Sequence, residues 1–253
     1  MPASFLLLTP PRRRDLILQI QSLSKAFGSV IVADKIDLEI EAGTALGIIG
    51  PNGAGKSSLF NLIAGALAPD GGTIKLDGRD ITSLSARARA QAGISRSYQI
   101  PQPFVDLTVF ENLLVGATHS RPRGEDEVTE ICAAILERTG LLPLANRRAG
   151  ALTLLERKRL ELARALATEP RLLLLDEIAG GLTEAECNAL VRTISDIRGG
   201  GVTVVWIEHI VHALVAVVDR LLVLNFGRKI AEGEPRKVMA SPEVATIYMG
   251  IEA

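Results

Sequence analysis

The sequence predicts an α/β protein with a mainly parallel sheet, helices on both of its faces and a helical lobe inserted into it. Two stretches, "ALGIIG" (45–50) and "RLLLLD" (171–176), are almost continuously apolar, as strands buried on both faces are. Short runs of this kind alternate with helix-forming segments along the chain. Helix-forming sequence predominates between about residues 83 and 170, which predicts the inserted lobe.

The N-terminal half contains the first strand signals. We expect residues 1–15 to be an N-terminal extension and residues 16–250 to form a single domain. In "LILQIQSL" (16–23) and "IDLEIEAG" (36–43), apolar and polar residues alternate as they do in half-buried strands. "PDGG" (69–72) is a strong turn signal just before a further strand-like segment, "TIKLDG".

The second half returns from helices to strands. Helices are expected in the lobe at "VFENLLVGA", "EVTEICAAILERTG" and "ERKRLELARALA", with a loop at 119–126 between the first two. Strands resume at "RLLLLDE", "GVTVVWIEH" and "RLLVLNFG", and a helix separates the first two of these.

The composition narrows the possible classes of protein. A hydrophobic fraction of 47% and a charged fraction of 23% are typical of a globular chain. The net charge of -1 provides no general attraction to nucleic acid, so no nucleic-acid partner is expected. One basic cluster, Arg12 to Arg14, fits either a solvated tail or a contact with a membrane surface or nucleic acid.

Membrane and redox signals are weak. "SFLLL" (4–8) is too short for a signal peptide and its arginines follow it, and no run approaches the roughly 20 apolar residues that a spanning helix needs. Cys132 and Cys187 lack the spacing of metal ligands, so free thiols in a reducing compartment are expected.

A phosphate-binding loop is the most specific signal in the chain. "GPNGAGKSS" (50–58) matches G-x-x-x-x-G-K-[ST] and lies between a predicted strand and a predicted helix. Glycines allow successive backbone N–H groups to point at phosphate oxygens, and the helix N-terminus adds positive charge. Lys56 is placed to reach the outer phosphates and Ser57 to hold Mg²⁺. The expected phosphate contacts come from Asn52, Gly53, Ala54, Gly55, Lys56, Ser57 and Ser58.

An acid pair follows the second buried strand. Asp176 is placed to bind Mg²⁺, and Glu177 to take a proton from an attacking water. Two solvated acids at the end of a strand are the alternative, which the phosphate loop upstream disfavours. His209 closes the strand "VVWIEH", and it fits either a structural histidine or a ligand-binding one at the edge of the sheet.

These motifs, in this order, resemble the ATP-binding subunit of ABC transporters from about residue 16 to residue 250. The resemblance implies a P-loop NTPase core with a mixed, mainly parallel sheet, an antiparallel β subdomain and an inserted helical subdomain. It also implies that Phe27 stacks on adenine, that Gln99 senses Mg²⁺ and the γ-phosphate, and that His209 contacts the γ-phosphate. The implied cofactors are ATP and Mg²⁺, and the implied activity is ATP hydrolysis.

The segments 107–113 and 219–250 are most similar to the branch that serves uptake of branched-chain amino acids. The implied partners are transmembrane permease subunits, a second ATPase subunit in a homo- or heterodimer and, indirectly, a periplasmic solute-binding protein. The implied location is the cytoplasmic face of the inner membrane, as a peripheral subunit. Two alternatives remain: an ATPase of lipid or polysaccharide export, and a soluble ABC ATPase without a transport function.

The sequence departs from the family where the signature L-S-G-G-Q is expected. Here "LTLLE" (152–156) keeps only Leu152 and a hydroxyl at Thr153. Thr153 and Glu156 also fit a capping box, S/T-x-x-E, at the start of a helix. We therefore expect a capped helix here, with Thr153 as a candidate phosphate contact, and a weakened ATP site wherever a dimer uses this signature. A smaller departure is "IAGGLT" (178–183), which has no Asp after Glu177.

Overall fold

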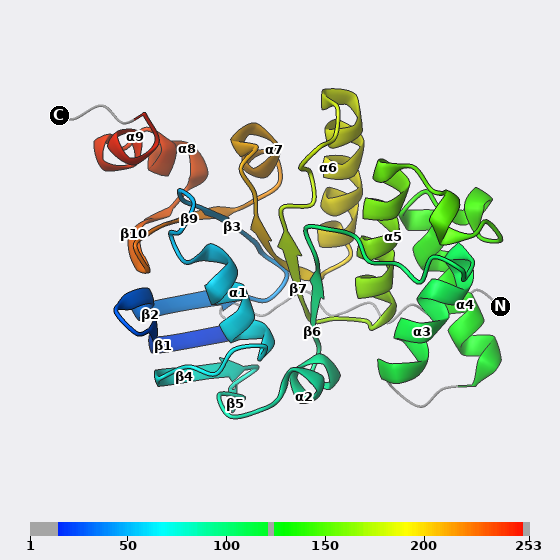
Figure 1. Ribbon diagram of the computed structural model, residues 1–253, viewed down its shortest axis with the longest axis horizontal. Helices are drawn as coiled ribbons and strands as arrows, with labels where there is room; N and C mark the ends of the chain where they lie inside the picture. Colours follow the sequence, from blue (N-terminus) through cyan, green and yellow to red (C-terminus); the bar gives the residue numbers. More distant parts are fainter. Residues whose placement is uncertain (1–14, 121–123, 250–253) are drawn as a thin grey trace.

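The structure is a computed structural model that describes residues 15–120 and 124–249. Two sheets and their covering helices form the body of the protein (Figure 1). The expectations for "SFLLL", for Arg12 to Arg14 and for the tip of the loop at 119–126 fall outside these residues.

An antiparallel sheet forms one side of the protein, with the strand order β2-β1-β4-β5. Its strands are β1 (Leu16–Phe27), β2 (Val30–Glu41), β4 (Gly71–Leu76) and β5 (Arg79–Asp80). The polar–apolar alternation of the sequence explains how this sheet packs, because Ile36, Leu38 and Ile40 of β2 are buried while the residues between them are exposed. This sheet confirms the antiparallel part of the predicted fold.

The main sheet has the order β10-β9-β3-β8-β7-β6. Its strands are β3 (Ala45–Ile49), β6 (Ile94–Ser97), β7 (Leu172–Asp176), β8 (Thr203–Ile207), β9 (Arg220–Asn225) and β10 (Arg228–Gly233). All neighbouring pairs are parallel except β10 with β9. Every residue of β3, β7 and β8 is buried, including Trp206, as expected for strands covered on both faces.

Helices cover both faces of the main sheet. They are α1 (Lys56–Ala64), α2 (Ala86–Gln91), α3 (Val109–Ser120), α4 (Glu125–Arg138), α5 (Leu154–Ala167), α6 (Glu184–Gly199), α7 (Val211–Val215), α8 (Pro235–Met239) and α9 (Pro242–Met249), with short 3-10 turns η1 (Leu142–Leu144) and η2 (Ala149–Ala151). Helices α3, α4 and α5 gather at one end, away from the antiparallel sheet (Figure 1). We refer to residues 109–167 as the helical arm.

Two hydrophobic cores lie on opposite faces of the main sheet. One joins alternate residues of β3, β7, β8 and β9 to the helical arm and to α6 and α7. The other joins the remaining residues of those strands to α1 and the antiparallel sheet, so α1 lies between the two sheets (Figure 1). The helix that follows the phosphate loop is therefore held from both sides by apolar contacts.

Most predicted elements are present, and one strand falls where the sequence favours helix. Strand β6 lies inside the range 83–170, and it pairs with β7 in the main sheet. It has only four residues, so its pairing with a distant strand, rather than local propensity, decides its conformation. Cys132 and Cys187 are buried free thiols. Among the described residues, no helix is both long and apolar enough to cross a membrane.

Arg89 is a buried cation that secures the C-terminal end of α1. Its Nη1 donates hydrogen bonds to the carbonyl oxygens of Leu62 at 2.5 Å and Ile63 at 2.9 Å. Nη2 and Nε donate to the carbonyl oxygens of Thr82 at 2.8 Å and Leu84 at 3.1 Å. The last carbonyl groups of a helix lack partners within the helix, and a cation is favourable there. Arg89 thus fixes the helix that begins at the phosphate loop.

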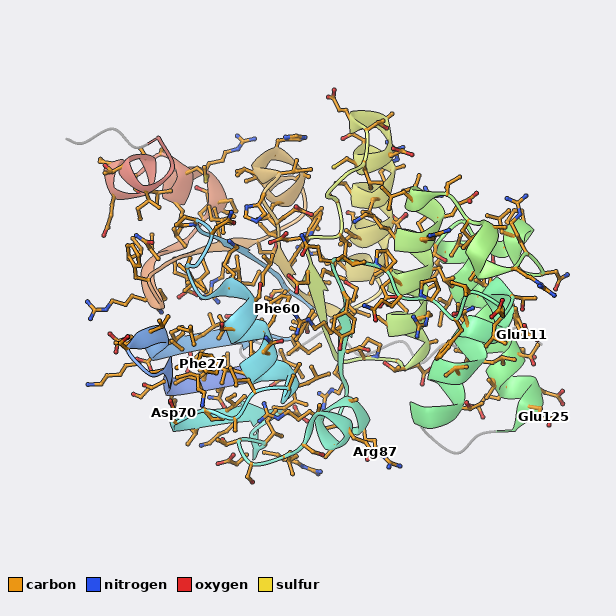
Figure 2. The ribbon with its side chains drawn as sticks, in the orientation of Figure 1. Phe27, Phe60, Asp70, Arg87, Glu111 and Glu125 are labelled. Carbon is orange, nitrogen blue, oxygen red and sulfur yellow. The ribbon has the colours of Figure 1, made fainter. Side chains whose placement is uncertain are left out.

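Replacing Arg89 with Leu should leave these carbonyl groups without their donor in a buried setting. We expect Arg89→Leu to lower the free energy of unfolding by about 3 kcal/mol or more, measured by urea denaturation. The matched control is Arg87→Leu, because Arg87 is exposed on the same helix and points away from the protein (Figure 2). The control should change stability by less than about 0.5 kcal/mol. Equal effects of the two changes would contradict the role of Arg89.

Candidate functional site

Residues 50–55 form a tight loop between β3 and α1, and residues 56–58 begin the helix, as the motif predicts. Helix α1 begins at Lys56 with Gly55 as its N-cap, and neither a side-chain cap nor an acidic residue occupies its first turn. The first N–H groups of a helix have no partner within the helix, so they are available to an anion. Gly53 and Gly55 have φ angles of 79° and 100°, which glycine adopts without strain.

Lys56 is buried beside this loop. Its Nζ donates hydrogen bonds to the carbonyl oxygens of Gly50 at 2.7 Å and Pro51 at 3.1 Å. Burial lowers the pKa of Lys56, and the negative charges of Glu177 and Asp176 oppose this shift. An ammonium group has three N–H donors, so one remains for a ligand that enters the loop.

A cavity of about 330 Å³ opens at the loop. It is lined by Val30, Val32, Asn52, Gly53, Ala54, Gly55, Lys56, Ser57, Ser58 and Glu177. All seven residues from Asn52 to Ser58 that are expected to contact phosphate thus line one cavity, together with Glu177. Phe27 lies at the end of β1 (Figure 2), where it pairs with Val30, and the residue is 53% exposed. Because its partner Val30 lines the cavity, this exposed position suits a flat ligand group stacking on the ring.

The acid pair follows β7 at the same edge of the sheet. Asp176 is 6% exposed, and Nη2 of Arg96 donates a hydrogen bond to its Oδ2 at 2.5 Å. Glu177 receives a hydrogen bond on Oε2 from Nε2 of Gln99 at 2.6 Å, and Nε2 of His209 lies 2.9 Å from its Oε1. The structure therefore brings Gln99 and His209 together at Glu177.

The backbone at Glu177 is unusual. Its φ angle is 46°, in the left-handed region that residues with a side chain seldom adopt. The N–H of Glu177 donates to the carbonyl oxygen of Ile207 at 2.9 Å, which anchors this turn to the end of β8. Such local strain is common at functional sites, where the surrounding structure maintains it.

Glu208 is a buried carboxylate that the sequence did not assign to the site. It is 2% exposed, and it accepts hydrogen bonds from the N–H of Ala179 at 2.8 Å and of His209 at 2.9 Å. Burial raises the pKa of Glu208, while the backbone N–H groups oppose this shift. Glu208 links the turn after Glu177 to the segment that carries His209. An acid at the end of an apolar strand was its only signal in the sequence.

The residues expected to hold Mg²⁺ fit that ion chemically. Asp176, Ser57 and Gln99 offer oxygen atoms, which Mg²⁺ prefers. Among the described residues, no group of three or more His, Cys, Asp or Glu side chains could hold a metal ion by itself. Protein sites for Mg²⁺ often provide only one or two carboxylates and rely on substrate phosphates for other ligands. An acid beside a phosphate loop fits this pattern.

Thr153 occupies the capping position that its sequence predicts. The backbone N–H of Thr153 donates to Oε2 of Glu156 at 2.8 Å, and the backbone N–H of Glu156 donates to the hydroxyl of Thr153 at 3.4 Å. The capping box of α5 is confirmed. Thr153 does not line the cavity at the phosphate loop, so within one chain the structure does not bring it to that loop.

A second cavity, of about 430 Å³, lies between the helical arm and the acid pair. It is lined by Gln99, Ile100, Pro101, Leu154, Lys158, Glu177, Gly180 and Gly181. Leu154 is 45% exposed at the start of α5, while Lys158 is buried. Burial lowers the pKa of Lys158, and the charges of Glu208 and Glu177 oppose this shift. Lys158 is a second cation near the acids that the sequence did not reveal.

A phosphate loop between a buried parallel strand and a helix, with an acid pair at the same sheet edge, defines a P-loop nucleotide-binding protein. The family description "ABC transporter" matches residues 33–180. Over 249 residues, the chain is 36% identical to the high-affinity branched-chain amino acid transport ATP-binding protein BraF of Pseudomonas aeruginosa, covering 92% of this chain and 98% of that protein. The chain belongs to the ABC transporter family.

Other similarities agree with this assignment. Over 234 residues, the lipopolysaccharide export system ATP-binding protein LptB of Acidithiobacillus ferridurans is 32% identical, covering 92% of this chain and 97% of that protein. A nucleotide-free ATP-binding cassette of an ABC transporter aligns with a TM-score of 0.85 and 31% identity, covering 94% of this chain and all of that chain (100%). An ATP-binding cassette in its ADP conformation aligns equally well, with a TM-score of 0.85 and 33% identity, covering 93% of this chain and 99% of that chain. The predicted family, fold class and ATPase activity are confirmed.

Two glycines of the phosphate loop allow a matched test of its geometry. A Cβ at Gly55 would lie 2.3 Å from the backbone oxygen of Val32, whereas one at Gly53 would meet no atom within 4 Å. We expect Gly53→Ala to lower the free energy of unfolding by about 1–2 kcal/mol, for its left-handed backbone alone. Gly55→Ala should cost about 3 kcal/mol or more, since the clash adds to that strain. Chemical denaturation of both variants tests this expectation, and equal losses would contradict it.

Proposed function

We propose that this chain is the ATP-hydrolysing subunit of a membrane importer for branched-chain amino acids or related small solutes. The observation that supports this most is the position of Glu177, which lines the cavity of the phosphate loop and contacts both Gln99 and His209. The similarity to BraF, whose name describes branched-chain amino acid transport, supports the class of solute.

The phosphate loop binds the nucleotide in this proposal. Backbone N–H groups of the loop and of the first turn of α1 surround the phosphates, and the free donor of Lys56 reaches the outer ones. Phe27 stacks on the adenine at the rim of the cavity. Magnesium held by Asp176 and Ser57, with Gln99 beside them, would neutralise charge on the phosphate oxygens.

Glu177 acts as the general base. Each oxygen of its carboxylate has one partner, Gln99 or His209, and each retains a lone pair for the proton of an attacking water. Gln99 and His209 keep the carboxylate oriented toward the cavity, so the base requires no rearrangement when the water arrives. Glu208 supports this geometry by holding the segment of His209 through backbone hydrogen bonds.

A second ATPase subunit completes each ATP site in the proposal. The family resemblance implies that the signature of one subunit faces the phosphate loop of the other. In this chain, the hydroxyl and the N–H of Thr153 are engaged with Glu156, and leucines replace both glycines. A carboxylate at Glu156 also repels phosphate. We therefore propose an unlike partner, whose signature serves the phosphate loop of this chain.

Permease subunits in the membrane are the direct partners of this pair, and a periplasmic solute-binding protein acts with them indirectly. The ATPase then lies peripherally on the cytoplasmic face of the inner membrane. A second candidate function, energising lipid or polysaccharide export, is supported by the 32% identity to LptB. Co-purification of the chain with its membrane partner distinguishes the two, because the solute contacts lie on other chains.

Replacing Glu177 with Gln tests the general base. We expect Glu177→Gln to lower kcat for ATP by about 10²–10⁴-fold, since an amide cannot accept the proton, while ATP still binds. Phosphate release measures turnover, and equilibrium titration measures binding. The control, Glu137→Gln, makes the same chemical change at an exposed position of α4 and should leave kcat unchanged. Full turnover by Glu177→Gln would remove Glu177 from this role.

The unlike-partner proposal predicts an asymmetric response to substitution. The purified chain alone should hydrolyse ATP at least about tenfold more slowly than the pair, because its own signature lacks transition-state contacts worth over 1.4 kcal/mol. In the pair, Lys56→Ala of this chain should stop turnover, whereas Thr153→Ala should change it less than twofold. Steady-state ATPase assays measure all three. Full turnover by the chain alone, or a severe effect of Thr153→Ala in the pair, would contradict an unlike partner.

A further inference from the structure

Arg96 is a cation that contacts the carboxylate expected to hold the metal. It lies on β6, in register with Leu174 of the neighbouring strand β7. Its Nη2 donates to Oδ2 of Asp176 at 2.5 Å, and its Nη1 donates to Oδ1 of Asn61, on α1, at 2.6 Å. The side chains of Arg96 and Asp176 are only 11% and 9% exposed. This ion pair is therefore shielded from solvent and stronger than a surface pair.

Two aromatic rings fix the guanidinium in this position. Its central carbon lies 5.6 Å from the ring centroid of Phe60 and 5.1 Å from that of Tyr98. Contacts of this kind attract a cation, and they add to the two hydrogen bonds. Nε of Arg96 is buried without a hydrogen-bond partner within the described residues. The arginine is therefore held by the hydrogen bonds of its two terminal nitrogens and by the aromatic rings against its guanidinium. The guanidinium is therefore oriented toward Asp176 and is largely withdrawn from solvent.

The charges around the acid pair explain what this contact does. Asp176 is buried and the adjacent Glu177 is partly buried, and two such carboxylates at the end of a strand would attract a free divalent cation. Arg96 occupies Oδ2 of Asp176 and neutralises its charge, while Oδ1 keeps its lone pairs. A metal ion that arrives alone then meets only one free oxygen of Asp176, Oδ1, near two cations, Arg96 and Lys56. A metal ion that arrives with phosphates brings its remaining ligands and negative charge.

We propose that Arg96 is a positioning residue for Asp176, which orients this carboxylate and prevents a divalent cation from binding before the nucleotide. The proposal rests on the proposed ATPase function. In this arrangement the ion pair makes the metal site dependent on nucleotide. Without Arg96, Asp176 would hold its full charge beside the phosphate loop, attracting free metal and repelling metal-free ATP.

The test measures binding of Mn²⁺, used as a probe for the Mg²⁺ site, to the complete chain without nucleotide. Electron paramagnetic resonance of the free ion reports the affinity. We expect Arg96→Met and Arg96→Gln to bind Mn²⁺ about tenfold more tightly than the wild-type protein. In the same variants, ATP affinity in the presence of EDTA should fall about tenfold and recover when Mg²⁺ is added. Arg96→Lys keeps the charge and should stay within about threefold of the wild type.

The matched control is Arg171→Gln, which removes the same charge at the opposite end of β7. Arg171 pairs with Asp77 at 2.5 Å on the surface, with both side chains about half exposed (48% and 51%). This control should bind Mn²⁺ and ATP as the wild-type protein does. If Arg171→Gln and Arg96→Gln changed Mn²⁺ and ATP affinity equally, the effect would come from net charge in general, and the proposal would be overturned.

Three further results would overturn the role of Arg96. One is wild-type affinity for Mn²⁺ in both neutral variants. Another is that Arg96→Met and Arg96→Gln both fail to fold while Arg96→Lys folds with unchanged metal binding. The positive charge would then be required only for folding. The third is loss of folding in all three variants. The proposed function fails separately, if the wild-type protein binds no ATP with or without Mg²⁺.

Discussion

The parallel pairing of β6, β7, β8 and β3 is the constraint on which the site depends. The registers align Ser97 with Leu175, Asp176 with Ile207, and Ile48 with Ile207. The strands therefore end together, and the segments that follow them meet at one edge of the sheet. These segments carry the phosphate loop, the acid pair, Gln99 and His209. A shift of one strand by one residue would separate groups that now lie within hydrogen-bonding distance.

The entry to the helical arm contacts both acids of the pair. Arg96 contacts Asp176, and Gln99, three residues later, contacts Glu177. Both carboxylates of the acid pair are thus held by one short segment that leads from the sheet into the arm. A displacement of the arm would act on both carboxylates through direct contacts. These direct contacts are enough to couple the arm to the site, so a longer pathway through the core is not required.

The sequence predicted the parts of the site that are local in the chain. The phosphate loop, the acid pair and the capping box of Thr153 depend on spacings of a few residues, so their patterns are visible without a fold. Arg96 and Glu208 were missed because their partners are distant: Arg96 and Asp176 are 80 positions apart, and Glu208 and Ala179 are 29 apart. Only the register of the sheet brings these partners together. The same reason explains β6, whose four residues become a strand through pairing with β7.

The single tryptophan of the chain, Trp206, lies next to this arrangement. It is fully buried in β8, in register with Leu175, directly before the acid pair on the neighbouring strand. Its indole N–H has no hydrogen-bond partner within the described residues. An indole in such a dry, apolar setting emits at short wavelength, and its fluorescence responds to small changes in the packing around it. The protein therefore contains one optical reporter, without any label, close to the strand ends where its nucleotide chemistry takes place.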